Sequence, residues 1–136
     1  MDDHRILVVD DDDSIRRLLV DFFQQLAPLQ VDWARDGAEA LHFLSSRSYA
    51  AVVLDVMMPH MSGIDLLASL QAMTADPTSK IHDVPAIFMI TAAAQEDVPS
   101  DTIEGRFPSM VRRVFRKPLD VRSLADEVVA TVGPSR

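Results

Sequence analysis

The hydrophobic and polar positions of this chain follow two alternating patterns. Five short, mostly apolar runs indicate strands, at residues 6–9, 29–34, 49–54, 84–90 and 111–116. Between most of them, apolar residues recur at intervals of three and four, which indicates one face of a helix. Strands that are apolar throughout are typical of a parallel sheet covered on both faces. The alternation therefore predicts βα units and an α/β domain with helices on both sides of the sheet.

The helical segments differ in how clearly they can be read. The first has the strongest periodicity, with an apolar face that extends from Ile15 to Leu26 and Pro28 after its end. Polar residues that can cap a helix precede three of the segments: Asp13 or Ser14, Ser62 and Asp120. Residues 74–83 read as a polar connection. Residues 95–108 contain Pro99, Gly105 and Pro108 with little periodicity, so only a short or distorted helix is predicted there.

Composition narrows the class of protein. A chain of 136 residues is long enough for one domain with one core, and without a repeat or linker we expect residues 1–136 to form a single domain with no second one attached. The formal net charge of −8 disfavours direct nucleic-acid binding. The absence of cysteine excludes disulfides, thiolate metal sites and thiol catalysis. With no signal peptide and no apolar run of roughly 18 residues, we expect a cytoplasmic protein without membrane insertion.

Polar side chains gather where the predicted strands end. In chain order they are Asp10, Asp11, Asp12 and Asp13, then Asp55, Thr91 and Lys117. Each has an ordinary interpretation on its own, as a helix cap, a turn residue or a solvated side chain. Because the carboxyl ends of parallel strands share one edge, however, we expect all four places to meet, where ligands of such sheets bind.

These residue types together suit phosphoryl transfer. Neighbouring carboxylates repel one another, and a hard divalent cation such as Mg²⁺, which prefers oxygen ligands, removes that repulsion. A hydroxyl and an ammonium group can hold the remaining phosphoryl oxygens. One carboxylate would then act as the nucleophile.

Four segments of the chain resemble the receiver domains of bacterial response regulators. Residues 6–12 read ILVVDDD, like the acidic opening of that family, and residues 55–63 match the phosphoacceptor pattern D-x-x-M-P-x-M-x-G at every fixed position. Residues 89–92 and Lys117-Pro118 match the two remaining blocks in order. The resemblance covers nearly the whole chain. It implies a flavodoxin-like, doubly wound (βα)5 three-layer sandwich with parallel strand order 2-1-3-4-5.

The resemblance also implies a role for each matching residue. Asp55 would be the phosphoacceptor, and Asp11 and Asp55 would bind Mg²⁺ or Mn²⁺ together with the backbone carbonyl of Met57. Asp10 would support the metal. Thr91 would hydrogen-bond to the phosphoryl group and Lys117 would pair with it, after a cis bond to Pro118. Asp12 and Asp13 are left as capping residues.

Two features depart from the family pattern. An aromatic switch residue is usual three positions before the lysine, but this chain has Val114 there and Phe115 next. In a regular strand Phe115 would point to the opposite face of the sheet. The Gly-Ala pair that is common before the last strand is also missing, and residues 107–110 read FPSM instead. We therefore expect an atypical fourth helix and a modified route from phosphorylation to output.

The sequence favours a phosphoacceptor that is not an enzyme acting on other substrates. Its expected partners are a sensor histidine kinase or a His phosphotransfer protein, and a downstream protein that the sequence does not identify. A receiver-like interaction module without phosphorylation is the main alternative. An aspartyl-nucleophile phosphatase is disfavoured, because such enzymes have a second carboxylate two residues after the nucleophile, where this chain has Met57.

Overall fold

The chain forms a parallel sheet between two layers of helices. The computed structural model describes residues 4–26, 29–58, 60–78, 84–91, 107 and 110–132. Its elements are, in chain order, β1 (Arg5–Val9), α1 (Asp13–Gln24), β2 (Gln30–Ala34), α2 (Gly37–Ser46), β3 (Ala51–Asp55), α3 (Gly63–Ala75), β4 (Ala86–Thr91), β5 (Val111–Arg116) and α5 (Val121–Val132). The five strands are parallel in the order β2-β1-β3-β4-β5. The predicted fold class and strand order are therefore confirmed.

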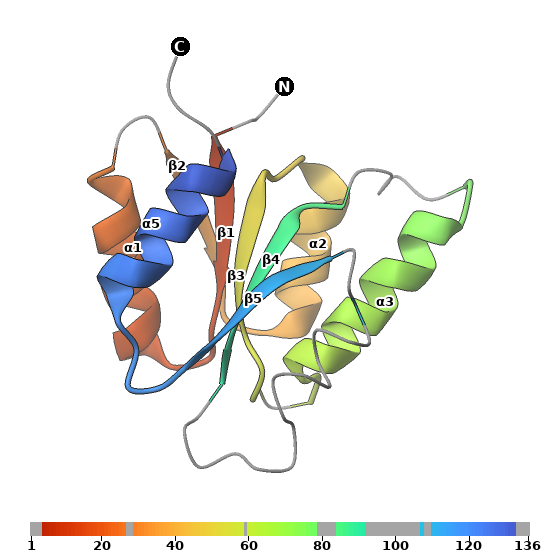
Figure 1. The fold of residues 1–136 in the computed structure, drawn as a ribbon. Coiled ribbons are helices and arrows are strands. Elements are labelled where there is room, and N and C mark those ends of the chain that lie inside the picture. The colour runs from red at the N-terminus through yellow and green to blue at the C-terminus, as the bar shows by residue number, and fades with distance from the viewer. Residues whose placement is uncertain are drawn as a thin grey trace.

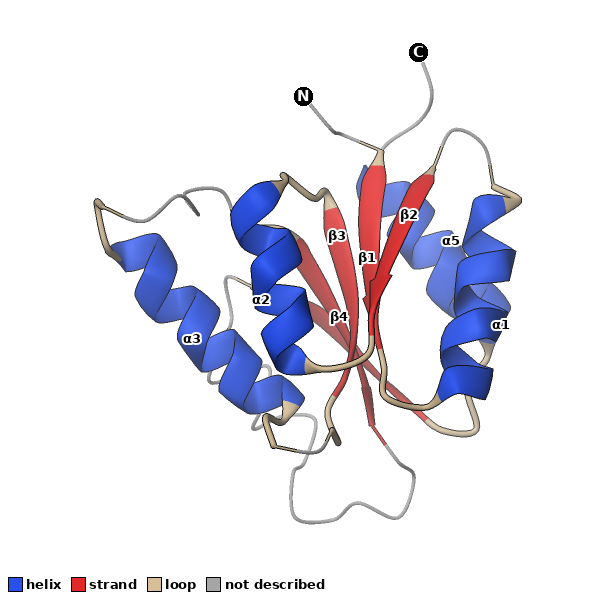
Figure 2. Cartoon of the chain, turned by 180° about the vertical axis from the view of Figure 1, so that it is seen from behind, coloured by secondary structure: helices blue, strands red, loops and turns tan. Residues whose placement is uncertain are grey.

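The helices divide between the two faces of the sheet. Figure 1 shows α1 and α5 together on one face, and α2 and α3 on the other. Seen from behind, the same three layers appear in Figure 2. This is the arrangement that strands apolar on both faces require.

Successive strand residues supply two separate cores. In β1, Leu7 and Val9 belong to a cluster with side chains from α2 and α3, whereas Ile6 and Val8 belong to a cluster with side chains from α1 and α5. We call these the α2/α3 core and the α1/α5 core. The alternation follows from the two-residue period of a strand. Both cores rest on the same sheet, which holds the strand ends in a fixed relation.

The cap of α1 confirms the assignment of Asp12 to capping and corrects the choice of Asp13 or Ser14 for the helix start. Asp12, rather than Asp13 or Ser14, occupies the N-cap, and its carboxylate accepts hydrogen bonds from the backbone N–H groups of Ser14 and Ile15 at 2.9 and 3.2 Å. The apolar periodicity starts only at Ile15 and so placed the helix start too late. By contrast, Ser62 caps α3 as predicted, and the Asp120 carboxylate accepts a hydrogen bond from the Ser123 N–H at the start of α5.

Four strands and one helix have other limits than the apolar runs suggested, and β1 begins one residue earlier, at Arg5. Leu29 donates its N–H to Leu26 in a turn, so β2 begins one residue later. Tyr49 is buried beside the α2/α3 core although β3 starts only at Ala51. Pro85 has no N–H to donate, and β4 starts after it. α3 continues to Ala75, past the predicted start of the polar connection.

Several predictions lie outside the described residues. Within residues 95–108 only Phe107 is described, and the predicted helix stops at Pro28, Gly133 and Pro134 are outside as well. None of the helices that the structure describes is long and apolar enough to cross a membrane.

Candidate functional site

Three carboxylates meet at the carboxyl edge of the sheet. Asp10 follows the last residue of β1, and Asp55 is the last residue of β3. The two strands pair with Val9 opposite Leu54, which places Asp10 and Asp55 at adjacent strand ends. Asp11 completes the group, and one carboxylate oxygen from each of the three lies within 4.8 Å of the others.

Asp10 is fully buried and only partly satisfied. Its Oδ1 accepts a hydrogen bond from the Asp12 N–H at 2.9 Å, and its own N–H donates to the carbonyl of Ala34 at 3.2 Å. Among the residues that the structure describes, Oδ2 has no hydrogen-bond partner although it is buried. A buried carboxylate oxygen without a partner is costly to the fold. Burial also raises the pKa of Asp10, and the charges of Asp11 and Asp12 act in the same direction.

Asp55 lies in the same buried environment. Its side chain is almost inaccessible, and its Oδ1 accepts a weak hydrogen bond from the Met57 N–H at 3.3 Å. The Nζ of Lys117 lies 4.0 Å from the same oxygen. Burial and, after it, the charge of Asp10 raise the pKa of Asp55 to about 7, against the opposing effect of Lys117. The ionised form of the Asp55 carboxylate is thus disfavoured, and a nearby cation would stabilise it.

β4 and β5 bring the other two candidate residues to this edge. Thr91 ends β4 and is fully buried, and its carbonyl accepts a hydrogen bond from the Lys117 N–H at 2.9 Å. Lys117 follows β5 and is joined to Pro118 by a cis peptide bond, as the resemblance implied. Its side chain is 28% exposed, so Lys117 lies near Asp55 and is partly open to solvent.

The loop between β3 and α3 carries Met57 and closes tightly against the sheet. Val56 donates its N–H to Ile90, and the Gly63 N–H donates to the carbonyl of Val56. A Cβ atom on Gly63 would lie 2.6 Å from the Asp55 carbonyl oxygen. Steric contact thus explains the glycine at the end of the D-x-x-M-P-x-M-x-G segment, because only a residue without a side chain allows this close approach. Met57 itself is exposed beside Asp55.

The donor set fits a hard divalent cation. Asp10, Asp11 and Asp55 are the group of possible metal ligands found among the described residues, and all three offer oxygen. Mg²⁺ binds through one or two carboxylates and keeps several waters. The Oδ2 of Asp10, which has no partner among the described residues, and the raised pKa of Asp55 both fit a site that a bound cation would stabilise.

Sequence reasoning missed one residue next to this cluster. Arg16 of α1 is buried, and its Nη1 donates to the carbonyl oxygen of Asp10 at 3.0 Å. The apolar helix face drew attention to its neighbours Ile15 and Leu19 instead. The signal in the sequence was a basic residue next to Ile15 on the apolar helix face and three residues after Asp13, with which it can pair.

Val114 and Phe115 point to opposite faces, as predicted for a strand. Val114 is half-buried against the α2/α3 core, whereas Phe115 belongs to the α1/α5 core. Their partners in β4 are Met89 and Ile90. The Phe115 ring therefore lies on the opposite face of the sheet from Val114. A change of rotamer cannot bring it to the position of Val114, where the family usually has an aromatic residue.

The family model described as the response regulator receiver domain matches residues 6–128. This chain belongs to that family, and it is a receiver domain of the kind found in two-component response regulators.

Among curated proteins, the chain is similar to the transcriptional regulatory protein SrrA of Staphylococcus aureus. The two are 32% identical over 127 residues, which cover 93% of this chain and 47% of that protein. The chain thus spans about half the length of the curated relatives it matches.

Solved structures share the fold over most of their length. The receiver domain of Francisella response regulator 1452 is 26% identical with a TM-score of 0.75, covering 94% of this chain and 95% of that one. The response regulator TrrA of Thermotoga maritima, solved in complex with Mg²⁺ and BeF, is 28% identical with a TM-score of 0.71, covering 93% and 97%. A CheY-like receiver domain from Methanospirillum hungatei, at 23% identity and a TM-score of 0.74 over 93% of this chain and 91% of that one, is similar in fold.

Proposed function

We propose that this chain is the phosphoacceptor of a two-component or phosphorelay system and that Asp55 is the residue that is phosphorylated. The observation that carries the proposal is the cluster of Asp10, Asp11 and Asp55 with the Lys117 ammonium 4.0 Å from Asp55. In the transfer, a carboxylate oxygen of Asp55 forms a bond to phosphorus. The phosphorus–nitrogen bond of the donor phosphohistidine breaks, and its electron pair stays on the imidazole.

Each neighbouring residue has a separate task in this proposal. Asp10, Asp11 and Asp55, with the backbone carbonyl of Met57, hold Mg²⁺ or Mn²⁺, which supplies charge neutralisation when bound. Thr91 donates its hydroxyl to one phosphoryl oxygen. Lys117 pairs with another oxygen, for which its Nζ, 4.0 Å from Asp55, is suitably placed. The complex of TrrA with Mg²⁺ and BeF supports this choice of cation.

The signal would enter and leave by protein contacts. A sensor histidine kinase or a His phosphotransfer protein is the proposed donor, and residues 1–136 act as one receiver unit in the cytoplasm. The chain acts on its own Asp55 only. The acidic net charge of −8 argues against direct contact with nucleic acid, so the output passes to another protein.

Phosphorylation with a small donor tests the proposal directly. Incubation with acetyl phosphate and Mg²⁺ should add one phosphoryl group to the protein, measured as intact mass. Asp55→Asn should abolish the addition, while Asp21→Asn, which removes a charge from an exposed position of α1, should retain it. Lys117→Ala should still bind Mg²⁺ and gain the phosphoryl group more slowly. An unchanged mass of the wild-type protein would instead favour an interaction module without phosphorylation.

A further inference from the structure

One buried cation lies beside the carboxylate cluster and is not part of it. Arg16 is only 7% exposed, and among the described residues no other arginine or lysine is buried. A guanidinium group is stable inside a protein only when its donors and its charge are satisfied. What satisfies Arg16 therefore indicates what it does.

Three contacts hold the guanidinium group. Its Nη1 donates to the carbonyl oxygen of Asp10 at 3.0 Å, and its Nη2 forms an ion pair with the Asp13 carboxylate. Its central carbon lies 4.6 Å from the centre of the Trp33 ring, within the range of a cation–π interaction. A lysine ammonium is less suited to all three contacts, because its donors share one nitrogen, whereas the planar guanidinium offers Nη1 and Nη2 in different directions and a flat face to the ring.

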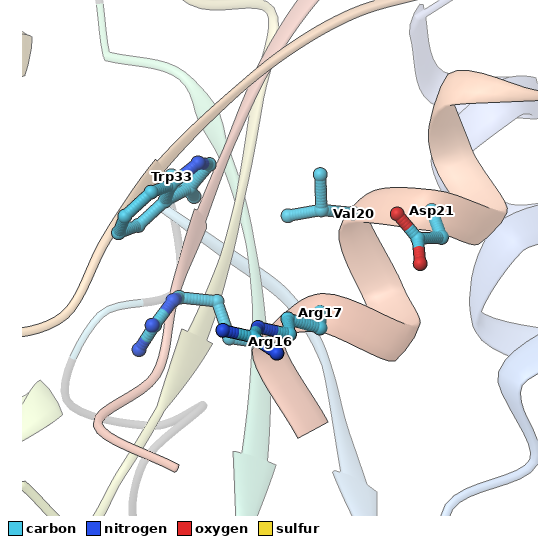
Figure 3. A pocket seen from close by; sticks show the side chains of 5 residues that line it. All are labelled: Arg16, Arg17, Val20, Asp21 and Trp33. Atoms are coloured by element: carbon cyan, nitrogen blue, oxygen red, sulfur yellow. The ribbon is translucent and has the colours of Figure 1, made fainter. Parts of the chain in front are cut away.

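Trp33 provides the surface on which Arg16 rests. It comes from β2, and Figure 3 shows Arg16 reaching from α1 toward the ring, with Val20 on the next turn of the helix. The indole is 45% exposed, so it forms one wall of an open pocket and is not a core side chain. A large exposed aromatic residue at the end of a strand is explained here by the cation it covers.

Both backbone groups of Asp10 are consequently linked to the end of β2, one directly and one through Arg16. Its N–H donates to Ala34, the residue after Trp33, and its carbonyl accepts from Arg16, which lies on Trp33. The side chain is held through Oδ1 by the Asp12 N–H, which leaves Oδ2 unpartnered among the described residues. Asp11, the next ligand candidate, is attached to the carbonyl that Arg16 holds.

We propose that Arg16, supported by Trp33, is a positioning residue for the cation site: it fixes the peptide between Asp10 and Asp11 so that their carboxylates are preorganised for Mg²⁺. The proposal rests on the cation site of the proposed function. Arg16 acts through geometry, since it contacts a carbonyl group of the cluster and its own charge is paired with Asp13. Interactions that orient metal ligands in this way typically change metal affinity by about 10- to 100-fold.

The affinity of the folded protein for Mg²⁺ is the direct measure. Calorimetric titration of Arg16→Met should give a dissociation constant about tenfold higher than that of the wild type. Arg17→Met is the matched control, because the same substitution one residue away removes an exposed arginine that forms no hydrogen bond or ion pair with Asp10, and its affinity should equal the wild type. Arg16→Lys, which keeps one donor for the carbonyl, should lie between the two.

A merely structural role for Arg16 predicts a different result. In that case Arg16→Met would unfold at lower denaturant concentration in EDTA, and the protein that remains folded would bind Mg²⁺ with wild-type affinity. The titrations are therefore made below the unfolding transition of each variant, with circular dichroism as the check on folding. Equal affinities in the wild type and Arg16→Met would overturn the inference and leave the cation site intact. No Mg²⁺ binding by the wild type would overturn both.

A double-mutant cycle tests the part played by Trp33. Trp33→Leu should weaken Mg²⁺ binding in the same direction as Arg16→Met but by less, and Trp33→Phe, which keeps an aromatic face, should stay near the wild type. The double variant Arg16→Met/Trp33→Leu should bind no more weakly than Arg16→Met alone, because both changes remove one interaction. Additive losses would mean that Trp33 does not act through Arg16.

Discussion

At the scale of single residues, Asp55 illustrates the opposing demands on the site. In the proposed function the carboxylate must be ionised to act as a nucleophile, yet burial and the neighbouring Asp10 raise its pKa to about 7. In the folded protein without metal, the ionised form is therefore disfavoured relative to the unfolded chain, where the ordinary value is 3.8. The proposed phosphoacceptor therefore also destabilises the metal-free fold at neutral pH.

This conflict predicts a pH-dependent effect of Asp55→Asn. The raised pKa means that the wild-type stability associated with Asp55 is present below pH 4 and is lost as the pH rises to about 7. Asparagine does not ionise, so the metal-free variant should be more stable than the wild type at pH 8, by on the order of 2–4 kcal/mol. The difference should shrink steadily as the pH falls toward 4.

Urea unfolding in EDTA at several pH values measures this difference. Asp21→Asn removes the same charge from an exposed position of α1 and should follow the wild-type profile. A stability gain of Asp55→Asn that is the same at pH 5 and pH 8 would contradict the assignment of the effect to ionisation.

At the scale of elements, the sequence predicted the existence of the helices and strands better than their ends. Periodicity reports which side chains are buried, but a strand ends where its ladder of hydrogen bonds ends. Tyr49 is buried outside β3 because its ring packs beside the α2/α3 core while its hydroxyl donates to Asp32 at 2.6 Å. Such contacts between distant residues cannot be read from a local pattern.

Helix caps are the exception, because their residues are near in sequence. At the start of α3 the Ser62 hydroxyl accepts from the Asp65 N–H at 3.1 Å, and the Asp65 carboxylate accepts from the Ser62 N–H at 3.2 Å. Ser62→Ala should lower the free energy of unfolding by about 1 kcal/mol. Ser69→Ala, within the same helix, should be neutral or slightly stabilising, because alanine has the higher helix propensity.

Equilibrium urea denaturation of both variants measures these changes. Since α3 follows the loop that carries Met57, the Ser62 variant should be compared with the wild type in EDTA, where cation binding does not contribute. Equal stabilities of Ser62→Ala and Ser69→Ala would mean that the reciprocal hydrogen bonds contribute nothing net.

At the scale of the whole molecule, the site and the sheet are one unit. The candidate residues end or follow β1, β3, β4 and β5, which are adjacent in the sheet. Binding of a cation at this edge should therefore stabilise the entire fold, by about 2.7 kcal/mol when free Mg²⁺ is 100 times its dissociation constant. Urea unfolding with and without Mg²⁺ measures it, with NaCl at equal ionic strength as the control.

The effect of Asp55→Asn should reverse between the two conditions. Without metal the variant is expected to be the more stable protein at pH 8. With Mg²⁺ the wild type should gain stability, whereas the variant, which lacks one ligand charge, should gain much less. Equal stabilisation of wild type and variant by Mg²⁺ would exclude Asp55 as a ligand.

The sequence by itself determined the α/β class, and its family motifs implied the strand order; together they brought Asp10, Asp11, Asp55, Thr91 and Lys117 to one sheet edge. It could do so because alternating burial patterns are local, and parallel strands place their carboxyl ends together whatever lies between them. Only the tertiary structure decided that Tyr49 is buried outside β3 with its hydroxyl on Asp32, and that Arg16 donates to the Asp10 carbonyl while its guanidinium group lies against Trp33. These features depend on hydrogen bonds and burial between segments that meet only in the folded chain, and no local pattern encodes such contacts.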